Sequence, residues 1–177
     1  STYHRNVAMM FQDPHSSLSP RRCVRALIAE PFVIHGFRER DLRAEVERLL
    51  ALVGLPKEFA ERYPHQLSGG QARRVGVARA IALNPKLIVA DEPTAGLDVS
   101  VQADILNLLL SLQQKLGLSY LIITHNLALV RHVSDETAIM YMGRFIEQGP
   151  TAEIFAAPAH PYTAALLAAQ PKPDPDQ

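Results

Sequence analysis

The sequence has a single cysteine, no net charge and no long apolar run, and each of these features excludes a class of protein. The only cysteine among 177 residues is Cys23, which rules out an internal disulfide and a zinc site built from cysteines. The formal net charge is zero, so the chain has no general basic field for nucleic acid. No apolar run approaches the roughly 20 residues that cross a bilayer, and no signal peptide is visible. A globular protein of a reducing compartment fits these absences.

Short apolar runs alternate with amphipathic segments along most of the chain. The apolar runs do not alternate with polar residues, which predicts a parallel sheet covered on both faces. After residue 135 the pattern changes to a hairpin around Met142-Gly143 and two short helices. The predicted strands are 7–11, 87–90, 119–124, 137–141 and 144–148; the predicted helices are 24–34 (broken by Pro31), 41–53, 70–83, 100–115, 126–132, 151–157 and 162–169; residues 171–177 form a frayed tail.

Two adjacent carboxylates, Asp91 and Glu92, follow the apolar run at residues 87–90. Ligands of open α/β sheets bind beyond the carboxyl ends of the strands. A carboxylate there can hold Mg²⁺, directly or through water, while its neighbour orients or deprotonates an attacking water. The alternative is an acidic loop start that caps the next turn.

The segment Leu67-Ser68-Gly69-Gly70-Gln71 stands at the predicted start of the helix 70–83. Ser68 is a candidate N-cap, and glycine allows the backbone amides to approach a phosphate at the positive end of the helix dipole. The alternative is an ordinary serine cap after a glycine turn.

Two further polar residues follow predicted strands. Gln12 comes after the run 7–11 and could contact a metal or water, and His125 comes after Thr124 and could donate to a terminal phosphate. The alternative for Gln12 is a loop residue, and the alternative for His125 is a capping or packing residue. Arg73, Arg74 and Arg79 are predicted to form a solvated or salt-bridged face of their helix.

The order of these motifs resembles the ATP-binding subunit of an ABC transporter over nearly the whole chain. The resemblance implies a partial P-loop NTPase (RecA-like) parallel sheet, with a helical signature subdomain and a small C-terminal extension. Flanking segments resemble the oligopeptide/dipeptide/nickel importer branch. These segments are Phe11-Gln12-Asp13-Pro14, Tyr63-Pro64-His65-Gln66, Gly143-Arg144, Glu147-Gln148-Gly149-Pro150 and His160-Pro161-Tyr162-Thr163.

The resemblance assigns four residues to the subunit's own ATP site. Asp91 would bind Mg²⁺ through water, and Glu92 would be the general base. Gln12 would be the Q-loop glutamine that links the metal site to the membrane subunits. His125 would be the switch histidine on the γ-phosphate.

Other residues would face a second ATP-binding subunit, identical or paralogous. Ser68, Gly69, Gly70 and Gln71 belong to the signature, which would close on ATP held by the opposite subunit. Asp98 would belong to the D-loop at the dimer interface. The family often has Ser-Ala-Leu-Asp there, whereas this chain has Ala-Gly-Leu-Asp and keeps the aspartate.

Partners and domain limits follow from the same resemblance. The chain would sit peripherally on the cytoplasmic face of the cell membrane, bound to transmembrane permease subunits and acting indirectly with a solute-binding protein, without nucleic acid. Its parts would be the end of the N-terminal core (1–12), the signature subdomain (13–84), the C-terminal core (85–135) and an extension (136–177). Residues 13 to about 32 would help to form the groove for a membrane subunit.

The phosphate-loop pattern, Gly, four residues and Gly-Lys-Ser/Thr, is missing. None of the four lysines follows a glycine. We therefore expect the chain to be the C-terminal portion of a longer subunit, inactive as an ATPase alone and prone to associate through uncovered sheet surface. The alternatives are a non-hydrolysing module that docks transporter subunits, or an ABC ATPase outside transport.

Overall fold

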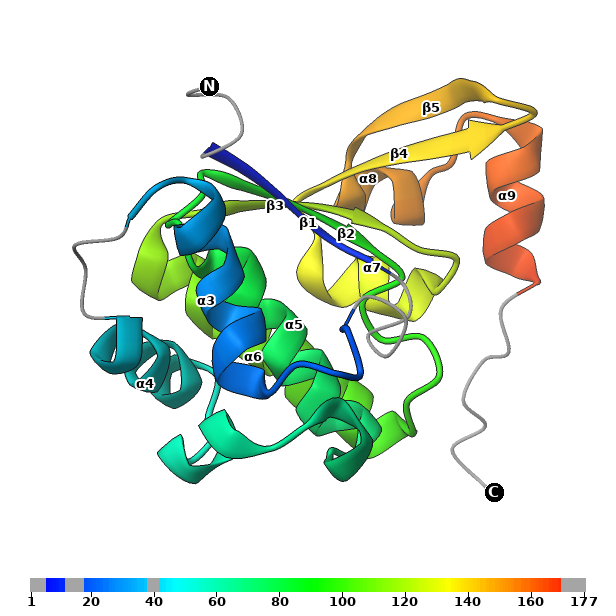
Figure 1. Ribbon diagram of the computed structural model, residues 1–177. Coiled ribbons are helices and arrows are strands. Elements are labelled where there is room, and N and C mark those ends of the chain that lie inside the picture. The colour runs from blue at the N-terminus through cyan, green and yellow to red at the C-terminus, as the bar shows by residue number, and fades with distance from the viewer. Residues whose placement is uncertain (1–5, 12–17, 38–41, 170–177) are drawn as a thin grey trace. The chain divides into compact units, whose positions relative to one another are not determined.

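The computed structural model describes residues 6–11, 18–37 and 42–169 of the chain (Figure 1). The chain divides after Ile123 into two compact units, and each unit is described by itself. Within the described ranges, no helix combines the length and the apolar character needed to cross a membrane.

The first unit is built on a parallel sheet of β1 (Val7–Met10), β2 (Leu87–Asp91) and β3 (Ser119–Ile123), in the order β1-β2-β3. The central strand is β2, whose residue Val89 pairs with Met9 on one side and Leu121 on the other. Ile88 and Ala90 are fully buried, as expected for an apolar central strand. The predicted parallel sheet is confirmed, and each strand end lies within one residue of its predicted position. The predicted cover on both faces is wrong within this unit, because Met9, Leu121 and Ile123 on the face away from the helices are each about half exposed.

Helices of the first unit pack on one another and on one side of this sheet. They are α3 (Val24–Ile34), α4 (Leu42–Leu52), α5 (Gly69–Ile81) and α6 (Val99–Leu116), with the short 3₁₀ helices η1 (Lys57–Glu61) and η2 (Pro64–Gln66) between α4 and α5. Figure 1 shows α3, α5 and α6 on the same side of the sheet, and α5 contacts β1, α3, α4 and α6. α6 buries Ile105, Leu109 and Leu112, and Gly117 ends the helix at a φ of 63°.

Helix ends show where the sequence rules hold and where they fail. α3 continues through Pro31, so the predicted break is wrong. Pro31 lacks the amide that would bond to the Leu27 carbonyl, but the helix continues to Ile34, and the Pro31 carbonyl accepts from the His35 amide at 3.1 Å. α5 ends at Ile81, before Asn84, which has a φ of 50°. Residue 41, the first of the predicted helix 41–53, lies outside the described residues.

The second unit contains an antiparallel hairpin and three short helices. They are α7 (Leu127–Val133), β4 (Glu136–Tyr141), β5 (Arg144–Pro150), α8 (Thr151–Ala156) and α9 (Pro161–Ala168). The predicted hairpin turn is confirmed at Met142 and Gly143, which both have positive φ angles of 48° and 75°. The buried hydroxyls of Thr137 and Thr151 lie 2.7 Å apart and tie β4 to α8.

One carboxylate joins the hairpin to the start of α9. Glu147 on β5 accepts from the Ala159 amide at 2.7 Å and from the His160 amide at 3.2 Å. His160 then caps α9, since its Nδ1 accepts from the Tyr162 amide at 3.1 Å. Tyr162 also packs on Tyr141 with ring centroids 4.3 Å apart. The region that follows the hairpin is therefore held to it by specific contacts.

Candidate functional site

Asp91 and Glu92 stand at the carboxyl edge of the central strand. Asp91 is half-buried and pairs with Ile123, and it shares a face of the sheet with Leu87 and Val89. The Glu92 amide donates to the Ile123 carbonyl at 2.8 Å, which ties the loop after β2 to the end of β3. Both carboxylates therefore lie where α/β sheets bind ligands.

Glu92 has an unusual backbone conformation. Its φ is 44°, in the left-handed region that costs an L-residue about 1 kcal/mol. Such strain persists only where the surroundings fix it, and it clusters at functional sites. This conformation could not be predicted from the sequence, because glutamate has no preference for it.

Ser68 is the N-cap of α5, as the sequence predicts. Its Oγ accepts from the Gln71 amide at 3.3 Å, and the Gln71 Oε1 accepts from the Ser68 amide at 3.0 Å. This reciprocal pair is a capping box. It leaves the amides of Gly69 and Gly70 at the open first turn, the end of a helix that favours an anion.

Asp98 is the N-cap of α6, a role that sequence reasoning missed. Its Oδ1 accepts from the Val101 amide at 2.9 Å and from the Ser100 hydroxyl at 2.8 Å. The Val101 amide, followed by the Ser100 hydroxyl, lowers the pKa of the Asp98 carboxyl below its ordinary value. The signal was present, since aspartate directly before an amphipathic helix is a preferred cap.

Arg73 departs most from the sequence expectation. It is 1% exposed, and its Nη1 donates to the Phe11 carbonyl at 2.9 Å, so the predicted solvated position is wrong. The spacing to Val77 and Ile81, four and eight residues on, places Arg73 on the buried stripe of α5. That spacing could have identified it. Arg73 fixes the main chain directly before Gln12.

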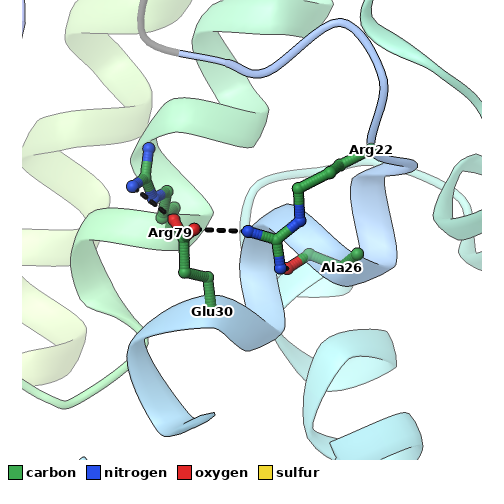
Figure 2. Close-up of polar contacts among 4 residues, drawn as sticks. All are labelled: Arg22, Ala26, Glu30 and Arg79. Atoms are coloured by element: carbon green, nitrogen blue, oxygen red, sulfur yellow. Dashed lines mark hydrogen bonds and ion pairs between the residues drawn. The ribbon is translucent and has the colours of Figure 1, made fainter. Parts of the chain in front are cut away.

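The other two arginines of α5 also contact neighbouring segments. The Arg74 Nη1 donates to the Val53 carbonyl at 2.7 Å. Arg79 pairs with Glu30 on α3, as Figure 2 shows, so the salt-bridged alternative is confirmed for Arg79. Arg22 pairs with the other oxygen of the same Glu30 carboxylate and donates to the Ala26 carbonyl. Two guanidinium groups thus share one carboxylate.

This cluster borders a cavity of about 310 Å³ in the first unit. The cavity is open to solvent between β1, α3 and α5. Its wall is apolar except where Glu30, His35, Arg73 and Arg79 reach it, and it includes Phe11, Leu18 and Ile34. Ile34 is 72% exposed at its rim. The cavity can take an apolar side chain.

The remaining candidates lie elsewhere in the chain. Gln12 is outside the described residues. His125 is an exposed residue of the second unit, directly before Asn126, whose Oδ1 caps α7 by accepting from the Leu129 amide at 3.2 Å. The structure therefore brings together the signature and the Asp98 loop within the first unit and leaves the roles of Gln12 and His125 as predictions.

The described residues offer carboxylate oxygens to a metal ion but not a complete set of ligands. Among the residues that the structure describes, no three His, Cys, Asp or Glu side chains gather as a metal site. Mg²⁺ commonly keeps several waters and takes only one or two carboxylates together with substrate phosphates. Asp91 therefore fits Mg²⁺ held mainly by water and nucleotide.

Fold and site together define a class: an α/β ATPase-type domain with carboxylates at the edge of a parallel sheet. The chain belongs to the ABC transporter family, whose model matches residues 1–95. A second model, for the C-terminal region of oligopeptide/dipeptide transporters, matches residues 146–177. The similarity to importer ATP-binding subunits that the motifs predict is confirmed.

Curated relatives carry names of one kind. The oligopeptide transport ATP-binding proteins AppF and OppF of Bacillus subtilis are 50% and 48% identical over 94% and 98% of this chain. The di/tripeptide transport ATP-binding protein DppF of Pseudomonas aeruginosa is 49% identical over 97% of it. The matches cover 51%, 58% and 54% of these proteins, so the chain spans about half of their length.

A solved structure supports the fold. CbiO1 from Clostridium perfringens, part of the ABC transporter complex CbiONQ, is 32% identical with a TM-score of 0.78. The similarity covers 88% of this chain and 61% of that protein. The predicted partial P-loop NTPase fold is therefore confirmed.

Proposed function

We propose that the chain contributes the catalytic carboxylates and the signature helix of an ABC importer ATPase that drives uptake of peptides or similar small solutes. The observation that carries this proposal is the placement of Asp91 and Glu92 at the carboxyl edge of β2, with Glu92 in a left-handed conformation. The names of the relatives, which are oligopeptide and dipeptide transport ATP-binding proteins, support the solute class.

Each candidate residue has a separate role in this proposal. Asp91 holds Mg²⁺ through water, and Glu92 takes the proton of the attacking water. Gln12 contacts the metal side of the site, and His125 donates to the terminal phosphate. When bound, Mg²⁺ offsets negative charge on the β- and γ-phosphates.

The signature is proposed to serve a second nucleotide. Ser68, Gly69, Gly70 and Gln71 present a helix start to ATP held by a partner ATP-binding subunit, and Asp98 lies at that interface. Because the Ser68 Oγ accepts from Gln71, its hydroxyl proton remains able to donate to a phosphate oxygen. The stretch from Leu67 to Asp98 would therefore supply two half-sites to different nucleotides.

The cavity beside Glu30 is our proposed contact with the transmembrane permease subunits. Its largely apolar wall suits an apolar segment of a partner. This contact would place the subunit peripherally on the cytoplasmic face of the membrane, and a solute-binding protein would act through the permease.

ATP hydrolysis should require a phosphate loop that this sequence lacks. Losing a single preorganised donor costs about 3 kcal/mol of transition-state stabilisation, and a missing loop with its lysine removes several donors. We therefore expect no phosphate release above background from the 177-residue chain alone. A clear ATPase rate from that chain would contradict the requirement.

The role of Glu92 is tested in the assembled transporter, in a subunit that carries both this sequence and a phosphate loop. Glu92→Gln keeps the shape of the side chain but removes the base, so the turnover number should fall about 100-fold or more while ATP binding persists. Glu58→Gln, an exposed residue on η1, is the matched control and should keep the wild-type rate. Wild-type turnover in Glu92→Gln would refute the proposed base.

A further inference from the structure

Two glycines of the signature lie against the loop and helix that carry Asp98. A Cβ on Gly70 would lie 2.7 Å from the Val101 Cγ1, and a Cβ on Gly69 would lie 3.2 Å from the Leu97 Cδ2. The first distance is shorter than real Cβ contacts allow. Val101 cannot easily swing aside, because a β-branched side chain in a helix has one strongly preferred rotamer. The first turns of α5 and α6 therefore pack at a distance that only glycine permits.

The residues that make these two contacts are bonded to, or directly follow, the polar residues that cap the two helices. Val101 is the residue whose amide donates to the Asp98 carboxylate, and the Leu97 carbonyl accepts from the Gln102 Nε2 at 2.8 Å. On the other side, Gly69 and Gly70 directly follow Ser68 within its capping box. A shift of either helix start would therefore move the other.

We propose that Gly70 and Val101 form a packing joint that holds Ser68 and Asp98 in fixed register, with Val101 as the positioning residue. This inference rests on the proposed function, which places Ser68 and Asp98 at a shared subunit interface. It gives the glycines a second purpose besides the approach of a phosphate. Closure on the partner's nucleotide then moves both residues as one body.

Gly76 offers a matched control on the same helix. A Cβ at Gly76 would meet nothing within 4 Å, so Gly76→Ala adds the same methyl group to α5 without touching α6. Gly70→Ala instead drives its methyl group into Val101. Val101→Ala removes the clashing methyl groups, so the double variant Gly70→Ala/Val101→Ala restores the space.

Hydrogen exchange of the whole 177-residue chain tests the joint. In Gly70→Ala the amides of Val101 and Gln102, which bond to Asp98, should exchange about tenfold faster or more. The double variant should return them to within about twofold of wild type, and Gly76→Ala should leave them unchanged. Wild-type exchange of these amides in Gly70→Ala, or no recovery in the double variant, would overturn the joint.

Folding failure and a failed proposed function give distinct results. If Gly70→Ala does not fold, a folded double variant supports the joint, and an unfolded double variant beside a folded Val101→Ala refutes it. In the assembled transporter, turnover should fall at least about tenfold in Gly70→Ala. Wild-type turnover in Gly70→Ala would refute the positioning role. A wild-type transporter without ATPase activity would instead refute the proposed function, and the exchange result would still decide the joint.

Discussion

A single strained residue distinguishes the end of β2 from an ordinary acidic loop. Glu92 keeps a φ of 44° because its amide bonds to Ile123 and its carbonyl accepts from the Ala95 amide. Those two hydrogen bonds hold the backbone on both sides of the residue. The fixed main chain holds the Glu92 carboxylate in place, which suits a group that must orient water.

Tyr120 on β3 carries a buried hydroxyl group. Its hydroxyl has no hydrogen-bond partner within the part of the chain that the structure describes. Burial raises the pKa of this phenol, so it stays neutral at physiological pH. A buried hydroxyl without a hydrogen bond lowers the free energy of unfolding, because it loses its bonds to water, whereas the ring of a phenylalanine has no such bonds to lose.

We predict that Tyr120→Phe raises the free energy of unfolding by about 1 kcal/mol, because the ring keeps its packing and the hydroxyl is no longer desolvated. Urea unfolding measures the change. Tyr63→Phe, which alters an exposed tyrosine, should be close to neutral. A loss of stability in Tyr120→Phe would mean that the hydroxyl has a partner after all.

At the scale of elements, the caps of α5 and α6 differ in their response to pH. The Ser68 cap is neutral, whereas the Asp98 cap depends on an ionised carboxylate. Because the Val101 amide lowers its pKa in the folded chain, Asp98 contributes stability above the ordinary value of 3.8. That contribution is lost as the pH falls through the lowered pKa.

We predict that the stability advantage of wild type over Asp98→Ala shrinks as the pH is lowered from 7 to below the ordinary carboxyl pKa. The matched variant Asp98→Asn keeps a neutral cap, so its advantage over Asp98→Ala should not depend on pH in that range. Chemical unfolding at several pH values measures both differences. Parallel curves for Asp98 and Asp98→Asn would contradict the assignment.

The elements themselves were largely predictable, and their exceptions have physical causes. Apolar runs and caps predict β2, α6 and the hairpin well because local pattern and burial agree there. Arg73 was misplaced because charged residues are rarely buried, and its burial depends on a carbonyl 62 residues away. The approach of Gly70 to Val101 likewise depends on two helices meeting, which no local pattern encodes.

Across the first unit, the two faces of the sheet differ in exposure. Ile88 and Ala90 are buried toward the helices, whereas Met9, Leu121 and Ile123 on the opposite face are each about half exposed. A contiguous apolar face of this kind is an interaction surface or an association hazard. The sequence predicts such association, but only the strand register identifies the residues involved.

We predict that Met9→Lys/Leu121→Lys weakens self-association of the 177-residue chain about tenfold or more, since charges across the open face oppose its burial. Sedimentation velocity over a concentration series measures the effect. Met142→Lys, at the exposed hairpin turn of the second unit, adds one such charge as a control and should change little. Equal association of both variants and wild type would place the contact elsewhere.

The hydrogen bond from Arg73 to the Phe11 carbonyl has a consequence for the whole molecule. Ser68 caps the start of α5, and Arg73, about one turn later on the same helix, donates to the Phe11 carbonyl directly before Gln12. The helix therefore connects Ser68 to the main chain before Gln12. A displacement of the signature is therefore passed to Phe11 through one turn of helix and the hydrogen bond from Arg73. In the proposed dimer, this route would carry a displacement of the signature to the main chain before Gln12 without passing through Asp91 or Glu92.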